Sequence, residues 1–169
     1  VAHGGRMVDF AGWSMPVQYH SIVEEHQATR KAVGLFDISH MGRLIIDGKD
    51  APAFLDSLLT RRIDDMTPGQ VRYSLACNEA GGVLDDVLVY QIQLPEGGLS
   101  GYGLVVNASN RAKIVAWLNQ RRSRFDVGID DKTSEYAMIA AQGPRAIEVL
   151  DAISDYELTS LRYYHGVMT

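Results

Sequence analysis

The stretch from Val71 to Gln93, VRYSLACNEAGGVLDDVLVYQIQ, decides the fold. Two runs rich in β-branched and aromatic residues flank a short segment, NEAGG, whose glycine pair allows a tight bend. The sequence therefore predicts an antiparallel hairpin with strands at 71–77 and 83–93. Two neighbouring carboxylates, Asp85 and Asp86, interrupt the second strand, and they need either a structural or a chemical explanation.

The segments on either side of this hairpin predict an α+β fold. We expect strands over 41–47, 102–107 and 125–130, helices over 51–59 and 110–122 capped by Asp50 and Ser109, and a loop over 95–101. The resulting order from Met41 to Asp130 is β-α-β-β-β-α-β. That order suits an antiparallel sheet with its helices packed on one face.

The two ends of the chain predict part of a second α+β layer. A helix is expected over 21–33 with Gly34 at its C-terminal end, a buried strand over 135–141, and a helix from Pro144 to about Ala152. We therefore expect a central α+β subdomain at 41–131. A partial subdomain would combine 1–40 with 132–169.

Composition excludes several classes of function. The 169 residues carry a formal charge of −5 and contain no dense Lys/Arg run, which argues against a nucleic-acid partner or an anionic membrane. The single cysteine, Cys77, and five scattered histidines predict neither an intrachain disulfide nor a metal site. No apolar run approaches the roughly 20 residues of a membrane helix, and no targeting segment is visible. We read the arginine pair at 61–62 as a solvated face.

Strand alternation singles out Asp86. It places this carboxylate on one face of the strand with Leu84, Leu88 and Tyr90, and we read that face as the less polar one. A lone carboxylate there is costly unless it is hydrogen-bonded, paired or held for use. Capping of loop amides near the hairpin bend is the alternative to a functional role. Asn107, which closes the apolar run LVV, could likewise bind a polar ligand or simply end the sheet.

Each of the other candidate residues could have a purely structural role instead of a functional one. Tyr73, Tyr163 and Tyr164 could stack on a ligand or serve as core aromatics. Met41 could line a pocket or fill the core. Cys77 has no histidine at a readable spacing to activate it, so we read it as an inert thiol.

Five stretches of the chain together resemble the glycine cleavage T-protein family, the aminomethyltransferases. They are MVDFAGWSMPVQY (Met7–Tyr19), GLFDISHMG (Gly34–Gly42), NEAGGVLDDVLVY (Asn78–Tyr90), LVVNASNRAK (Leu104–Lys113) and AAQGP (Ala140–Pro144). Members of that family continue well beyond the position of Thr169, so the chain resembles an incomplete, N-terminal portion.

The resemblance implies a tetrahydrofolate-dependent enzyme of glycine catabolism. Such an enzyme transfers the one-carbon unit of the aminomethyl-lipoyl H-protein to tetrahydrofolate and releases ammonia. The implied compartment is the bacterial cytoplasm, or the mitochondrial matrix in a eukaryote. The implied partners are folate and the lipoylated H-protein, with no metal, nucleic acid or membrane.

The resemblance also implies roles for particular residues. The second aspartate of the GG-x-x-DD motif, Asp86, would be the catalytic carboxylate, orienting the folate and stabilising positive charge. Asn107, Tyr73 and Met41 would line the folate pocket. Tyr163 and Tyr164 would lie near the folate tail. The sequence TRRID at 60–64 departs from the family, which commonly has an Asn-Asp pair after the threonine.

Two other readings stay open at this point. One is a related folate enzyme, such as a demethylase or the folate domain of a dimethylglycine- or sarcosine-oxidising enzyme, and methyl-donor specificity would distinguish it. The other is a non-catalytic folate-binding or iron-sulfur-assembly relative, or a scaffold that only binds partners. The paired aspartates count against that second reading.

Overall fold

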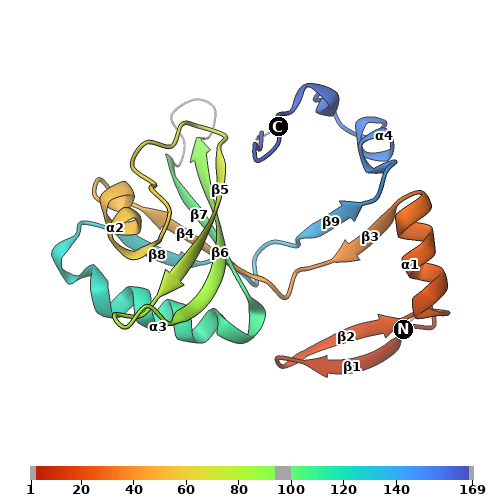
Figure 1. The fold of residues 1–169 in the computed structure, drawn as a ribbon, viewed down its shortest axis with the longest axis horizontal. Coiled ribbons are helices and arrows are strands. Elements are labelled where there is room, and N and C mark those ends of the chain that lie inside the picture. Colours follow the sequence, from red (N-terminus) through yellow and green to blue (C-terminus); the bar gives the residue numbers. More distant parts are fainter. Residues whose placement is uncertain (1–2, 94–99, 168–169) are drawn as a thin grey trace. The chain divides into compact units, whose positions relative to one another are not determined.

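A computed structural model describes residues 3–93 and 100–167 of the chain. Contacts divide it into two units. The first, which we call the sheet unit, comprises Met41–Tyr136 and Arg162–Thr169. The second, the end unit, comprises Val1–His40 and Ala137–Leu161. Both mix helices with antiparallel strands, which confirms the α+β class (Figure 1).

The sheet unit is built on five antiparallel strands in the order β5-β6-β7-β4-β8. Their bounds are β4 Gly42–Asp47, β5 Val71–Cys77, β6 Val83–Gln93, β7 Ser100–Val106 and β8 Gly128–Asp131. The predicted hairpin is present as β5 and β6, with Leu75 opposite Asp86. Residues 94–99, which include most of the expected loop at 95–101, lie outside the described part, and Ser100 and Gly101 already belong to β7.

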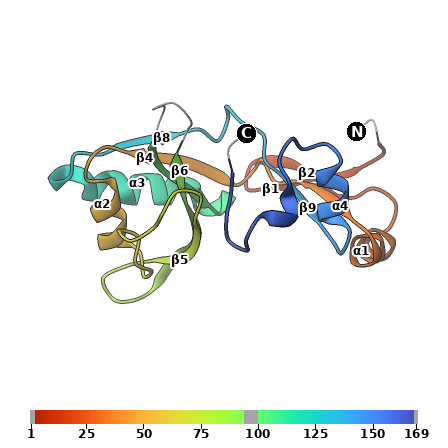
Figure 2. The same cartoon turned by 90° about the horizontal axis from the view of Figure 1, so that it is seen from above.

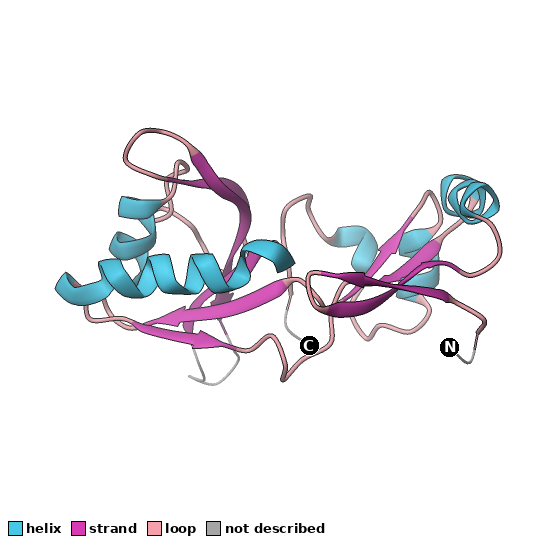
Figure 3. Cartoon of the chain, turned by 90° about the horizontal axis from the view of Figure 1, so that it is seen from below, coloured by secondary structure: helices cyan, strands magenta, loops and turns pink. Residues whose placement is uncertain are grey.

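Two helices, α2 (Ala51–Leu58) and α3 (Arg111–Arg121), cover one face of this sheet (Figure 3). The core between them is apolar and fully buried: Phe54 and Leu55 from α2, Ile114 and Leu118 from α3, and Leu44, Ile46, Val87, Val89, Leu104 and Val106 from the strands. Burial of this surface supplies the main driving force for folding of the unit.

The covered face corrects our reading of the alternation in β6. Asp85, Val87 and Val89 point to the helices, whereas Asp86 lies on the opposite face and is exposed. Leu84, Leu88 and Tyr90 are only partly buried. Both faces of β6 are apolar, so the strand pattern alone could not tell which one the helices would cover.

The helix ends differ from the sequence expectations. The Asp50 side chain makes no cap bond to α2, and its Oδ2 instead accepts from the backbone N–H of Asp126 at 2.8 Å. Ser109 does not cap α3, because a 3-10 turn, Ala108–Asn110, precedes that helix. Another 3-10 turn, Arg122–Arg124, follows it.

The end unit contains two pairs of antiparallel strands among its described residues. The hairpin of β1 (Arg6–Phe10) and β2 (Trp13–Gln18) was not predicted. The expected helix is α1 (Ile22–Lys31), capped by Ser21. Gly34 does not end this helix but begins β3 (Gly34–Asp37), which pairs with β9 (Ile139–Gln142). We expected a buried strand over 135–141, but the strand begins only at Ile139, which is 66% exposed. Helix α4 (Ala146–Asp151) and a 3-10 turn (Leu158–Ser160) complete the unit.

The last described residues pack on the sheet unit rather than on the end unit to which we had assigned them. The backbone N–H of Val71 donates to the carbonyl of Tyr164 at 2.8 Å, and that of Gly166 donates to the carbonyl of Gly69 at 2.8 Å. These bonds hold the segment 162–166 beside the start of β5, seen from above in Figure 2. None of the helices within the described ranges combines the length and apolarity needed to cross a membrane.

Candidate active site

The candidate residues Met41, Asn107 and Asp86 lie at one end of three neighbouring strands. Gly42 of β4 pairs with Val106 of β7, so Met41 and Asn107 each lie one residue beyond that pair. Leu88 of β6 pairs with Val105 of β7, and the same register brings Asp86 beside Asn107. The antiparallel sheet therefore gathers residues that are up to 66 positions apart in sequence (41 to 107).

Asn107 links the two aspartates. Its Nδ2 donates to Oδ1 of Asp85 at 2.9 Å and to Oδ1 of Asp86 at 2.8 Å. The same nitrogen lies 3.2 Å from the carbonyl oxygen of Asp86. The Asn107 amide thus orients the exposed Asp86 carboxylate, and the buried Asp85 carboxylate in turn fixes the position of that amide.

Asp85 has a structural role, as expected, but the amides that it binds belong to the turn after β7 rather than to the hairpin bend. Its side chain is only 3% exposed, and its Oδ2 accepts from the backbone N–H of Asn107 at 3.0 Å. Its Oδ1 also accepts from Nδ2 of Asn110 at 2.6 Å. A buried carboxylate needs such partners, and here they fix the turn that leads from β7 into α3. The two asparagines of VVNASN were the available signal in the sequence.

Tyr73 lies on the same exposed face as Asp86, one diagonal step away across the β5–β6 pair. The residue is 47% exposed. Partial desolvation, followed by the negative charge of the neighbouring Asp86 and hydrogen bonding with it, raises the pKa of the Tyr73 phenol. The phenol therefore stays protonated and acts as a donor to Asp86.

Of the two tyrosines in the C-terminal segment, Tyr164 lies near Tyr73, whereas Tyr163 is largely exposed. Tyr164 adopts a left-handed backbone conformation, with φ of 54°, which is uncommon outside glycine. Its ring and that of Tyr73 line a cavity of about 450 Å³. The Tyr163 ring packs edge-on against Tyr164 with centroids 4.6 Å apart, but Tyr163 is 89% exposed.

Met41 is partly buried at the start of β4, where its carbonyl accepts from Nη1 of Arg43 at 2.9 Å. The Arg43 guanidinium also donates to the carbonyl of Tyr136 at 2.6 Å. These bonds fix the backbone at Met41, and the sheet register places that backbone beside Asn107.

The open side of the sheet around Asp86 is largely apolar. This surface is formed by Tyr73, Leu75, Asp86, Leu88 and Tyr90. A flat ligand could pack on these side chains and direct polar atoms to Asp86 and Asn107. In the part of the chain that the structure describes, no group of three or more His, Cys, Asp or Glu side chains could hold a metal ion.

Comparison with known proteins places this arrangement in context. A family model described as "GCVT N-terminal domain" matches residues 1–169. An aminomethyltransferase from Moorella thermoacetica is 48% identical over 164 residues, which cover 97% of this chain and 43% of the relative. One from Thermosipho melanesiensis is 44% identical over 161 residues, which cover 95% of this chain and 43% of the relative.

A solved structure shows the same fold. The crystal structure of glycine cleavage system aminomethyltransferase T from Bartonella henselae superposes with a TM-score of 0.87 at 34% identity. The match covers 98% of this chain and 44% of that one. The chain therefore spans less than half the length of the relatives that it matches.

Proposed function

Because the chain belongs to the GCVT N-terminal domain family, we propose that it supplies the folate-binding carboxylate of an aminomethyltransferase of the glycine cleavage system. The chain covers about 44% of its solved relative, so turnover would be a property of the whole enzyme. The observation that carries the proposal is the Asp86 carboxylate, exposed on an apolar face and oriented by Asn107 and Tyr73.

The proposed reaction moves a methylene group between two carriers. The aminomethyl group on a lipoyl sulfur of the H-protein, S–CH2–NH3⁺, reacts with tetrahydrofolate, which gives up the protons of N5 and N10. The products are 5,10-methylenetetrahydrofolate, ammonium and a free lipoyl thiol. Both new C–N bonds form at the carbon that loses its bonds to sulfur and to nitrogen, so no oxidant is required.

Asp86 would act on the nitrogen heterocycle of the folate. A carboxylate has about four acceptor positions, and the hydrogen bonds from Asn107 and Tyr73 leave others free for ligand N–H groups. Its negative charge, held on a rigid strand, also stabilises positive charge that develops at the methylene carbon when a leaving group departs.

The other residues of the site fit a flat, partly aromatic ligand. Leu88 and Tyr90 offer an apolar surface for a heterocycle, and the rings of Tyr73 and Tyr164 suit the neighbouring benzoyl group. Asn107 uses its NH2 group on the aspartates, and its amide oxygen has no hydrogen-bond partner among the described side chains. That oxygen is suited to accept from a ligand N–H. Met41 would pack at the edge of the heterocycle.

The test is the transfer rate of the full-length enzyme with aminomethyl-lipoyl H-protein and tetrahydrofolate. Asp86→Asn removes the charge and keeps the shape, and we expect turnover to fall by about a hundred-fold or more. Asp155→Asn, an equal charge change at an exposed position in the end unit, serves as the matched control. Normal turnover by Asp86→Asn would refute the assigned role.

The same assay separates the related folate enzymes. Transfer from the aminomethyl-lipoyl H-protein supports the aminomethyltransferase. Activity only with an N-methylated amine would point to the demethylase type. Folate binding without either activity would point to a non-catalytic relative.

A further inference from the structure

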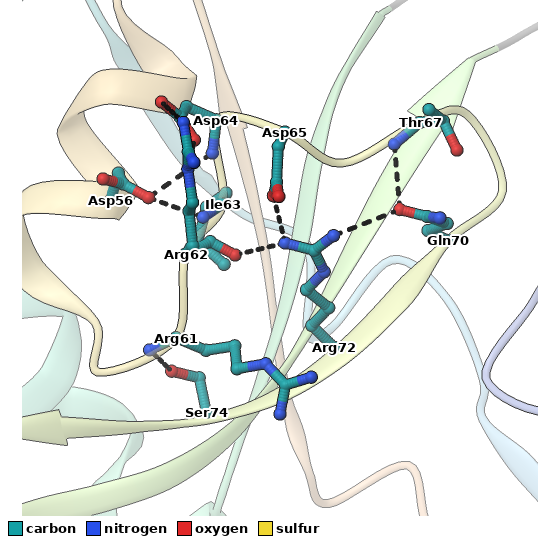
Figure 4. Close-up of polar contacts among 10 residues, drawn as sticks. All are labelled: Asp56, Arg61, Arg62, Ile63, Asp64, Asp65, Thr67, Gln70, Arg72 and Ser74. Carbon is teal, nitrogen blue, oxygen red and sulfur yellow. Dashed lines mark hydrogen bonds and ion pairs between the residues drawn. The ribbon is translucent and has the colours of Figure 1, made fainter.

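Arg61 differs from its charged neighbours in the loop between α2 and β5. Arg62 is paired with Asp64, with Nε 2.6 Å from Oδ1, and Arg72 is paired with Asp65 (Figure 4). The guanidinium of Arg61 points away from these acidic side chains (Figure 4). This guanidinium makes no ion pair or hydrogen bond with any residue in the described part of the chain. Arg61 is exposed, so its charge is accessible to a ligand.

The backbone at Arg61 is nevertheless fixed. Its N–H donates to Oγ of the buried Ser74 at 3.0 Å. The neighbouring Thr60 exchanges two hydrogen bonds with Leu75: Thr60 N–H to the Leu75 carbonyl at 3.0 Å, and Leu75 N–H to Thr60 Oγ1 at 3.1 Å. The free cation therefore extends from a rigid point at the edge of β5, so holding it near a ligand requires little ordering of the main chain.

Arg61 lines the same cavity of about 450 Å³ as Tyr73 and Tyr164. Gln70, Arg72 and His165 also line it. Nδ1 of His165 lies 3.0 Å from the Tyr163 carbonyl, while its Nε2 is buried with no partner among the described residues. Because Asp65 balances Arg72, the uncompensated charge of the cavity is the single positive charge of Arg61.

The cavity adjoins the proposed active site. Tyr73 belongs to both, since it lines the cavity and lies one diagonal step from Asp86 on the β5–β6 pair. The surface beside the Asp86 carboxylate thus carries two tyrosines and, lining the same cavity, Arg61. A complementary ligand carries N–H donors at one end, an aromatic ring in the middle and an anion at the other end.

We propose that Arg61 is the anchor for a carboxylate of the glutamyl tail of folate. The inference rests on the proposed function and names a specificity-determining residue for that site. Folate has the required order of groups: a heterocycle with N–H donors, a benzoyl ring and a glutamyl group. A guanidinium presents two parallel N–H donors that match a carboxylate, and no competing acid has to be displaced from Arg61.

Calorimetric titration of the full-length enzyme tests the inference with two ligands, 5-formyltetrahydrofolate and 5-formyltetrahydropteroyl amide, in which a neutral carboxamide replaces the glutamyl group. We expect Arg61→Gln to weaken binding of the folate about five-fold, which corresponds to roughly 1 kcal/mol. Binding of the neutral pteroyl amide should not change. Arg62→Gln is the matched control, because it removes the same charge one residue away from a side chain already paired with Asp64.

The possible results separate this inference from the proposed function. A folate-specific loss in Arg61→Gln alone supports the anchor. Equal losses for both ligands, equal effects of the two arginine variants, or no effect of Arg61→Gln would overturn it while the folate site stands. If the unmodified enzyme bound neither ligand, the proposed function itself would fail. Circular dichroism of each variant establishes that the compared proteins are folded.

Discussion

Replacing Asp85 by asparagine is expected to destabilise the sheet unit far more than the same change at Asp86. The Asp85 carboxylate accepts three hydrogen bonds in a site that is only 3% exposed. An asparagine of the same shape offers a single oxygen. If that oxygen faces the side-chain amides of Asn107 and Asn110, its NH2 group faces the backbone N–H of Asn107, and two donors then oppose each other.

The size of the effect follows from this lost acceptor. Leaving a buried N–H without a partner costs about 1–3 kcal/mol, so we expect roughly 2 kcal/mol for Asp85→Asn. Asp86 is exposed, and an asparagine there can still accept from Nδ2 of Asn107 through its own oxygen. We therefore expect less than about 1 kcal/mol for Asp86→Asn.

Hydrogen exchange measured by mass spectrometry provides a local assay. A global melting curve is unsuitable because a chain with two units need not unfold in one step. A local loss of about 2 kcal/mol accelerates exchange through opening of the segment 102–112 by about 30-fold. Exchange in that segment at the same rate in Asp85→Asn and Asp86→Asn would refute the argument that Asp85 holds the β7–α3 turn.

Two further predictions concern the sheet unit. Partial burial acts to raise the pKa of Asp131, but hydrogen bonds from Thr133 and Arg111 outweigh it and hold this pKa below its usual 3.8. The stability from this lowered pKa is complete above pH 3.8 and is lost as the pH falls through the lower native value. In acid titrations followed by fluorescence, Asp131→Asn should therefore show a shallower loss of stability below about pH 4 than the unmodified protein. Gly69 and Gly81 share a φ of +81°, but a Cβ at Gly69 would lie 2.8 Å from a carbonyl oxygen of the C-terminal segment, whereas at Gly81 it would meet open space. Alanine at Gly69 should speed proteolysis after residue 161 more than alanine at Gly81 does, and equal effects would show that the close approach is unimportant.

Much of the fold could be predicted because it depends on local patterns. The hairpin of β5 and β6 follows from two β-rich runs around a glycine pair, and α1 from a serine cap followed by mixed charges. The hairpin of β1 and β2 was missed because MVDFAGWSMPVQY alternates weakly and its strands are mostly exposed. The predicted helix caps were wrong for two reasons. The Asp50 side chain binds the distant backbone N–H of Asp126, and Ser109 lies within a 3-10 turn that precedes α3.

The sequence proposed candidate residues for the site but not their geometry. Asp86, Asn107 and Tyr73 were proposed from strand position and resemblance, and the structure places Asn107 and Tyr73 beside Asp86. The bonds that hold them, above all those to Asp85, join residues more than 20 positions apart and have no local signature. Arg61 was read as a solvated charge, since only the packed loop reveals which arginines already have acidic partners.

By itself, the sequence determined the α+β class, the central hairpin and the types of residue that meet at its exposed face, because alternation and turn chemistry act over a few residues. Only the tertiary structure decided which face the helices cover, and with it that Asp85 is the buried clamp and Asp86 the exposed carboxylate. The physical reason is that both faces of β6 are apolar. Helices α2 and α3, which are distant from β6 in the sequence, pack against Val87 and Val89 and so bury the face of β6 that carries Asp85.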